Sequence, residues 1–121
     1  MPKVMLVDDD ADLAEVVEII LVSHGFEVVT ILDGRQVLET VACFQPDVIL
    51  LDVNIADIDG REVCKELKAD HSLHHQIPVV LFSAMHDLTQ TYHKCKATDF
   101  ISKPFNTAHL VNTLKKYATG N

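Results

Sequence analysis

Six side chains in this sequence are of types that bind metals and phosphate, and each lies at the end of a short apolar run. They are three consecutive acids, one further acid, a hydroxyl and an ammonium: Asp8, Asp9, Asp10, Asp52, Ser83 and Lys103. Clustered carboxylates repel one another, and a bound cation relieves that repulsion. Their hard oxygen atoms suit Mg²⁺ rather than zinc or copper, and Mg²⁺ leaves sites free for a phosphoryl oxygen. Because an aspartate can itself be the nucleophile, the set predicts phosphoryl transfer to a carboxylate.

Apolar runs of strand length alternate along the chain with segments of helical periodicity. Strands are expected at five places: Lys3–Val7, Phe26–Thr30, Val48–Leu51, Val79–Phe82 and around Phe100–Ile101. Helices are expected between them and after Asn106, with Asp10 and Asn106 as N-caps and the fourth helix between Asp87 and Lys96. This alternation predicts βα units around a parallel sheet, whose carboxyl edge would gather the six side chains. The continuous apolar run Val48–Leu51 is expected at the centre of the sheet.

Length and composition predict one packed domain over residues 1–121. The chain carries 10 Lys and Arg against 18 Asp and Glu, a net charge of −8. Such a surface repels nucleic-acid phosphates and anionic lipid, so we expect no direct nucleic-acid binding and no membrane contact. No apolar run could span a bilayer and no signal peptide is visible, which predicts a cytoplasmic protein. Cys43, Cys64 and Cys95 lack zinc-ligand or redox spacing, so they are expected to be reduced, partly buried thiols.

The histidines are expected to take no part in this chemistry. His71, His74 and His75 have a spacing compatible with a metal pair, but no acid or cysteine nearby completes a set. Residues 71–76 are therefore expected to form a solvated loop. His86 lies just past Ser83, where a neutral surface imidazole is expected.

Five stretches of the chain resemble, in order and at family spacing, the receiver domain of bacterial two-component response regulators. They are Lys3–Asp10, Pro46–Asp52, Asp59–Gly60, Pro78–Ala84 and Asp99–Phe105. The resemblance implies a flavodoxin-like α/β fold, a doubly wound (βα)₅ sandwich with a five-stranded parallel sheet in the order 2-1-3-4-5. It also implies that the phosphoryl group comes from a sensor histidine kinase or a phosphotransfer protein. The signal would then pass to a downstream protein or to an attached output domain.

The resemblance assigns roles at the metal and phosphate site. It implies that Asp52 is the phosphoacceptor, that Asp9 binds Mg²⁺ directly and that Asp8 binds it mostly through water. The backbone carbonyl of Asn54 would be a further metal ligand, and Lys103 would face the phosphoryl oxygens. The Lys103–Pro104 peptide bond is expected to be cis.

Ser83 and Phe100 take the two switch positions of the family. Ser83 would bond the phosphoryl group and vacate space into which the Phe100 ring turns. The face formed by the fourth helix, the fifth strand and the last helix would then change shape. Five side chains are candidate contacts on that face: Tyr92, Lys94, His109, Asn112 and Lys116.

The sequence departs from the family pattern at three places. Ile55-Ala56 replaces the frequent Met-Pro just before a polar loop expected over residues 57–60, and this change is expected to touch no ligand. Lys96 replaces a glycine, so a positive φ there would strain the lysine. The stretch from Ser83 to Lys103 is about two residues shorter than usual. The last two changes affect the expected output face rather than the phosphate site.

Three other functions fit parts of the pattern less well. A phosphatase of the haloacid-dehalogenase type would use Asp52 as its nucleophile, but it needs an acid two residues later, where Asn54 stands. A flavin carrier of this topology needs a hydroxyl- and glycine-rich phosphate loop, and the acidic run 8–10 would repel the flavin phosphate. A scaffold that is not phosphorylated has no use for the acids and Lys103. The pattern favours a signalling phosphoacceptor that assists its own phosphorylation and dephosphorylation.

Overall fold

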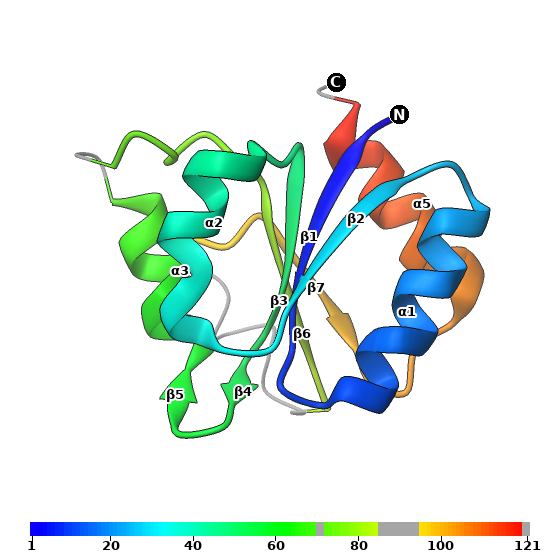
Figure 1. The fold of residues 1–121 in the computed structure, drawn as a ribbon, viewed down its shortest axis with the longest axis horizontal. Coiled ribbons are helices and arrows are strands. Elements are labelled where there is room, and N and C mark those ends of the chain that lie inside the picture. Colours follow the sequence, from blue (N-terminus) through cyan, green and yellow to red (C-terminus); the bar gives the residue numbers. More distant parts are fainter. Residues whose placement is uncertain (70–71, 85–94, 120–121) are drawn as a thin grey trace.

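Five parallel strands form the central sheet (Figure 1). The computed structural model describes residues 1–69, 72–84 and 95–119. The strands lie in the order β2 (Glu27–Ile31), β1 (Lys3–Val7), β3 (Val48–Asp52), β6 (Val79–Ser83) and β7 (Asp99–Ser102). Every neighbouring pair in this sheet is parallel. The predicted order 2-1-3-4-5 is confirmed, with β6 and β7 as the fourth and fifth strands of this sheet.

Helices cover both faces of the sheet. Helices α1 (Ala11–Ser23) and α5 (Thr107–Ala118) lie on one face, and α2 (Val37–Phe44) and α3 (Gly60–Lys68) lie on the other (Figure 1). A short 3₁₀ turn, η1 (Gly34–Gln36), leads into α2. The fourth predicted helix falls mainly on residues 85–94, which lie outside the described residues. Within the described ranges, the helices are too short or too polar to cross a membrane.

Side chains that alternate along each strand supply two apolar layers. On β1, Met5 and Val7 pack with α2 and α3, while Val4 and Leu6 pack with α1 and α5. Strands β3 and β6 divide in the same way, and all their residues are buried. Strands covered on both faces are continuous apolar runs in the sequence. For this reason β3 and β6 could be predicted from the sequence. Their register fixes where each strand ends, and with it the side chains at the carboxyl edge.

Side-chain caps set the starts of three helices. Asp10 and Asn106 each accept a hydrogen bond through Oδ1 from the backbone N–H three residues later, at 3.1 Å and 3.0 Å. Both were predicted as N-caps. Asp59 caps α3 in a similar way, through the N–H of Arg61 at 2.9 Å. Asp10 is therefore the N-cap of helix α1.

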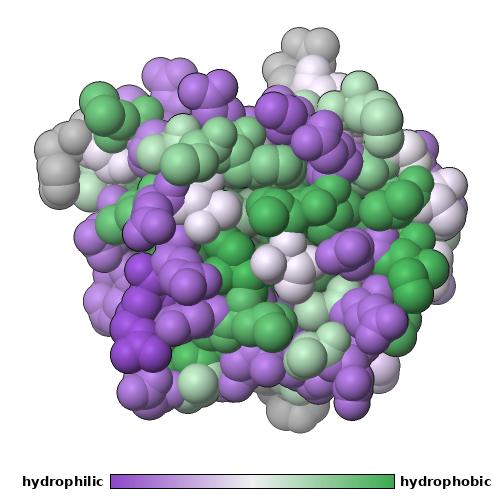
Figure 2. Space-filling model, viewed as in Figure 1, coloured by the Kyte–Doolittle hydropathy of each residue, from purple (hydrophilic) through white to green (hydrophobic). Residues whose placement is uncertain are grey.

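The outer surface mixes hydrophobic and hydrophilic side chains. Figure 2 shows this over the face that β2 forms with α1 and α2. Helix α1 buries Val17 and Leu21 but leaves Val16, Ile19 and Val22 exposed. Its outward side is thus partly apolar, which weakens the amphipathic contrast of this helix in the sequence.

A small antiparallel hairpin replaces the polar loop expected over residues 57–60. Its strands are β4 (Asn54–Ile55) and β5 (Ile58–Asp59), joined by a two-residue turn. Ala56, the first turn residue, has a φ of 55°. Two-residue hairpin turns normally give this left-handed conformation to Gly or Asn. Because alanine carries no such turn signal, the sequence did not predict the hairpin.

Lys96 also has a left-handed backbone, with a φ of 63°. A residue with a Cβ atom is less stable there by roughly 1–2 kcal/mol. We expect Lys96→Gly to raise the free energy of unfolding by about 0.5–1 kcal/mol, because glycine's larger unfolded-state entropy offsets part of the gain. Urea denaturation measures the change. Lys115→Gly, in helix α5, is the control and should lose about 1 kcal/mol; equal losses in both variants would show that Lys96 is not strained.

Candidate functional site

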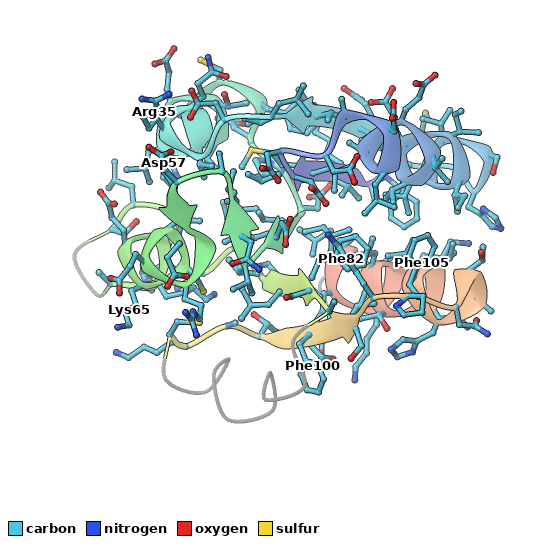
Figure 3. All side chains as sticks on the ribbon, turned by 90° about the horizontal axis from the view of Figure 1, so that it is seen from below. Arg35, Asp57, Lys65, Phe82, Phe100 and Phe105 are labelled. Atoms are coloured by element: carbon cyan, nitrogen blue, oxygen red, sulfur yellow. The ribbon has the colours of Figure 1, made fainter. Side chains whose placement is uncertain are left out.

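The carboxyl ends of four strands meet at one edge of the sheet, the edge that faces the viewer in Figure 3. Asp8 follows β1, Asp52 ends β3, Ser83 ends β6 and Lys103 follows β7. Lys103 N donates a hydrogen bond to Ser83 O at 2.9 Å, which continues the pairing of β6 with β7 beyond the strand ends. The structure therefore brings these four predicted site residues to one place.

Three carboxylates form a compact acidic cluster at this edge. One oxygen atom from each of Asp8, Asp9 and Asp52 lies within 4.8 Å of the other two. Asp8 and Asp52 are buried and Asp9 is exposed, so the cluster opens to solvent on the side of Asp9. Three hard oxygen donors at this spacing match the ligand preference of Mg²⁺. The acidic cluster therefore fits a divalent cation.

Lys103 bridges the two buried carboxylates. Its Nζ lies 3.0 Å from Asp8 Oδ2 and 3.4 Å from Asp52 Oδ2. The Lys103–Pro104 peptide bond is cis, as predicted. Because both carboxylates are buried, their repulsion is weakly screened by water, and the ammonium offsets it directly.

The ring of Phe82 also contacts the Lys103 ammonium. Lys103 Nζ lies 4.6 Å from the centroid of the Phe82 ring, close enough for a cation–π interaction. The rings of Phe82 and Phe105 pack with centroids 5.7 Å apart (Figure 3). This role could not be predicted from the sequence, because Phe82 lies inside an apolar strand and is indistinguishable there from a core residue. Two aromatic rings therefore help to position the lysine at the acidic cluster.

The environment of Asp52 disfavours its charged form. Burial, and next the charge of Asp8, raise the pKa of Asp52 from 3.8 to about 6, while the Lys103 ammonium opposes the rise. At neutral pH the Asp52 carboxylate is thus ionised, and its charge makes the folded state less stable. A cation bound beside it would reduce that destabilisation.

We expect Asp52→Asn to stabilise the metal-free protein at pH 7. The folded protein binds the Asp52 proton more tightly than the unfolded chain, so this contribution to stability is present below pH 3.8 and is lost as the pH rises through about 6. Removing the charge should raise the free energy of unfolding at pH 7 by on the order of 1–3 kcal/mol.

Urea denaturation in a chelator, as a function of pH, measures this effect. The advantage of Asp52→Asn should grow between pH 4 and pH 7. Asp57→Asn, in the exposed hairpin turn, is the control and should show no such growth. A variant that is less stable than the parent at pH 7 would show that Asp52 is not strained by its burial.

The exposed acid of the cluster is held by the hairpin. Ala56 N donates a hydrogen bond to Asp9 Oδ2 at 2.9 Å. The expectation that the change at Ile55-Ala56 touches no ligand is therefore wrong, since this bond reaches a predicted metal ligand. A proline at position 56 would have no N–H to donate.

Backbone groups orient the other two acids. Asp10 N donates to Asp8 Oδ1 at 2.9 Å, and Asn54 N donates to Asp52 Oδ1 at 3.3 Å. Gly60 packs against the Asp52 main chain, where an added methyl group would overlap the Asp52 carbonyl oxygen. The Asp59–Gly60 pair was predicted as part of a polar loop and as a stretch that resembles the receiver family, but its contact with Asp52 was not predicted, because a close approach of two backbones leaves no pattern in the sequence. The metal role of the Asn54 carbonyl stays a prediction.

The two predicted switch residues occupy different environments. Ser83 is buried at the edge, whereas Phe100 is partly buried and packs against the core layer under α2 and α3. Figure 3 shows Phe100 apart from the Phe82 and Phe105 rings.

Three of the expected contact residues, His109, Asn112 and Lys116, are exposed on α5; Tyr92 and Lys94 lie outside the described residues.

The histidine segment supplies no second metal site in the described part of the chain. The acidic cluster is the one group of metal-binding side chains found there. His74 is half-buried and His75 is exposed in a turn, and His71 and His86 lie outside the described residues.

A five-stranded parallel sheet in the order β2-β1-β3-β6-β7, with helices on both faces, defines a flavodoxin-like α/β domain. A family model, the response regulator receiver domain, matches residues 4–115. The chain therefore belongs to the response regulator receiver domain family of two-component systems.

Several known proteins and solved structures are similar to this chain. The DNA-binding response regulator MtrA of Mycobacterium tuberculosis is 37% identical over 111 residues, which cover 90% of this chain and 47% of MtrA. The chain spans about half the length of such curated relatives. A putative response regulator from Chloroflexus aurantiacus has a TM-score of 0.89 at 30% identity, covering 98% of this chain and 99% of that one. The chemotaxis response regulator CheY4 of Vibrio cholerae has a TM-score of 0.86 at 30% identity, covering 97% and 98%.

Proposed function

We propose that residues 1–121 act as one receiver domain that accepts a phosphoryl group on Asp52 in a Mg²⁺-dependent reaction. One observation carries the proposal: the buried Asp52 carboxylate lies within 4.8 Å of oxygens from two further acids and 3.4 Å from the Lys103 ammonium. A nucleophile, metal ligands and a fixed cation are the groups that phosphoryl transfer to a carboxylate requires.

The phosphoryl donor is a phosphohistidine on a sensor kinase or a phosphotransfer protein. An oxygen of Asp52 attacks phosphorus, the P–N bond breaks, and its electron pair returns to the imidazole nitrogen. Lys103 offsets the charge on the phosphoryl oxygens. Later attack by water on the same phosphorus releases inorganic phosphate and restores Asp52.

Asp9 would hold the Mg²⁺ directly, with Asp8 acting mostly through water and Asn54 supplying its carbonyl oxygen. The ion would supply charge neutralisation at the transferring phosphoryl oxygens. The hydrogen bond from Ala56 N–H holds the Asp9 carboxylate on the exposed side of the acidic cluster, where it could bind the ion.

We also propose that phosphorylation changes the outer face. The phosphoryl group offers new acceptor oxygens to the Ser83 hydroxyl, and Phe100 turns into the space that Ser83 leaves. The surface of β7 and α5 then presents a new shape to a downstream protein or an attached output domain. The MtrA relatives are DNA-binding response regulators about twice as long, which supports an attached output domain.

Phosphotransfer from a panel of purified, phosphorylated histidine kinases tests the donor. We expect at least one kinase to pass its phosphoryl group to the parent domain within minutes in Mg²⁺, and none to pass it to Asp52→Asn. Asp9→Ala should need more Mg²⁺ for the same rate. Transfer that continues unchanged to Asp52→Asn would contradict the proposal.

A further inference from the structure

Two cysteines form a buried contact away from the acidic cluster. Cys64 Sγ, on α3, donates a hydrogen bond to Cys95 O at 3.3 Å. Both side chains belong to the core layer under α2 and α3, whereas Cys43 is exposed. The expectation of three partly buried thiols is therefore wrong. The two residues are 31 positions apart, so no sequence spacing signalled the pair.

We propose that Cys64 and Cys95 form a redox site at which hydrogen peroxide converts the two thiols into an intramolecular disulfide. A disulfide needs its two side chains to approach without backbone rearrangement. Cys64 Sγ already lies 3.3 Å from the main-chain oxygen of Cys95, so the two residues are in direct contact. The new bond would tie α3 to the chain that leads into β7.

The two thiols have different chemical roles in this site. The interaction between the two side chains lowers the pKa of Cys95 and raises the pKa of Cys64, while burial raises the pKa of both thiols. The backbone N–H of Ala97 and the charge of Lys65 also lower the pKa of Cys95. Since the thiolate is the reactive form, Cys95 is the thiol that attacks and Cys64 is the one that resolves.

The reaction balances with one peroxide molecule. The Cys95 thiolate attacks one peroxide oxygen, the O–O bond breaks, and a sulfenic acid and hydroxide form; the hydroxide becomes water by taking up the proton that Cys95 lost on ionising. Cys64 sulfur then attacks the Cys95 sulfur, the S–O bond breaks, and the hydroxide leaves as a second water with the Cys64 proton. Two thiols lose two electrons in total, and the peroxide gains them.

Burial selects the oxidant. Cys64 is 0% exposed and Cys95 is 1% exposed. An oxidant must therefore be close to the size of water, which favours hydrogen peroxide over a bulky disulfide such as oxidised glutathione. The exposed Cys43 has no such restriction.

The experiment treats two forms of the whole chain, the parent and Cys43→Ser, with hydrogen peroxide or with oxidised glutathione. In peroxide, Cys43→Ser should lose both free thiols and two hydrogens in intact mass, and proteolysis should yield one linked peptide pair containing Cys64 and Cys95. Its melting temperature should rise, and dithiothreitol should reverse the rise. In oxidised glutathione, the parent should gain one glutathione on Cys43 and keep the buried pair reduced.

Two further variants test the order of the steps. After timed exposure to peroxide and then unfolding in urea with a sulfenic-acid trap, Cys95 in Cys64→Ser should be labelled about tenfold faster than Cys64 in Cys95→Ser. The proposal is overturned if Cys64 and Cys95 remain reduced in peroxide while Cys43 of the parent is oxidised. Oxidation of either buried cysteine without a linked peptide pair overturns it equally.

Discussion

Replacing Lys103 with alanine should slow phosphorylation of Asp52 by about 100- to 1,000-fold, the usual cost of removing one preorganised charge-stabilising group. In the described structure, the Lys103 ammonium contacts both Asp8 and Asp52, at 3.0 Å and 3.4 Å. Its removal leaves two buried carboxylates facing each other, and it also removes the positive charge expected to face the phosphoryl oxygens. Both effects oppose the approach of a negatively charged donor.

Acetyl phosphate with saturating Mg²⁺ gives this rate without a kinase, followed as the gain of one phosphoryl mass. Lys115→Ala, on the exposed side of α5, removes a lysine without touching the cluster and should phosphorylate at the parent rate. Ser83→Ala should be slowed less than Lys103→Ala, because it removes a hydroxyl rather than a full charge. A Lys103→Ala rate equal to that of Lys115→Ala would show that Lys103 takes no part in the phosphorylation reaction.

Gly60→Ala is the second substitution with a large expected effect, on stability. A methyl group at Gly60 would overlap the Asp52 carbonyl oxygen and would lie 3.1 Å from Val53 Cα. These are backbone atoms of a buried strand end, which cannot swing aside as a flexible side chain can. We expect the free energy of unfolding to fall by about 1–3 kcal/mol, and Asp52 to be phosphorylated more slowly because its main chain moves.

Gly34→Ala is the matched comparison for Gly60→Ala in urea denaturation. A methyl group at Gly34 would meet only side-chain atoms, with Ile58 Cγ2 at 3.3 Å as the nearest. Such atoms can give way by a few tenths of an ångström, so Gly34→Ala should lose clearly less stability. Equal losses in the two variants would show that the contact between Gly60 and Asp52 does not restrain the site.

The sheet could be predicted from sequence because its inner strands are covered on both faces. The run at β3 is uninterruptedly apolar, and the acid that ends it marks where the strand leaves the core. Helix caps at Asp10 and Asn106 were also visible, since they rest on local hydrogen bonds. The hairpin β4–β5 was not, because its turn places Ala56 in a conformation that alanine does not signal.

The residues at the acidic edge could be predicted, but the contacts that tune them could not. The carboxyl ends of parallel strands lie at one edge of the sheet. Asp8, Asp52 and Lys103 therefore lie close together, independently of the exact packing of their side chains. The bond from Ala56 N to Asp9 and the ring of Phe82 against Lys103 depend on packing between distant segments. The pairing of Cys64 with Cys95 depends on such packing as well.

Intact-mass measurement of the domain after incubation with acetyl phosphate tests whether Asp52 is a Mg²⁺-dependent phosphoacceptor. We expect the gain of one phosphoryl mass in Mg²⁺, its absence in a chelator, and its absence from Asp52→Asn under both conditions. Fragmentation of the modified parent should locate the group on Asp52. A phosphoryl gain that is equal with and without Mg²⁺, or that persists in Asp52→Asn, would show that Asp52 is not a Mg²⁺-dependent phosphoacceptor.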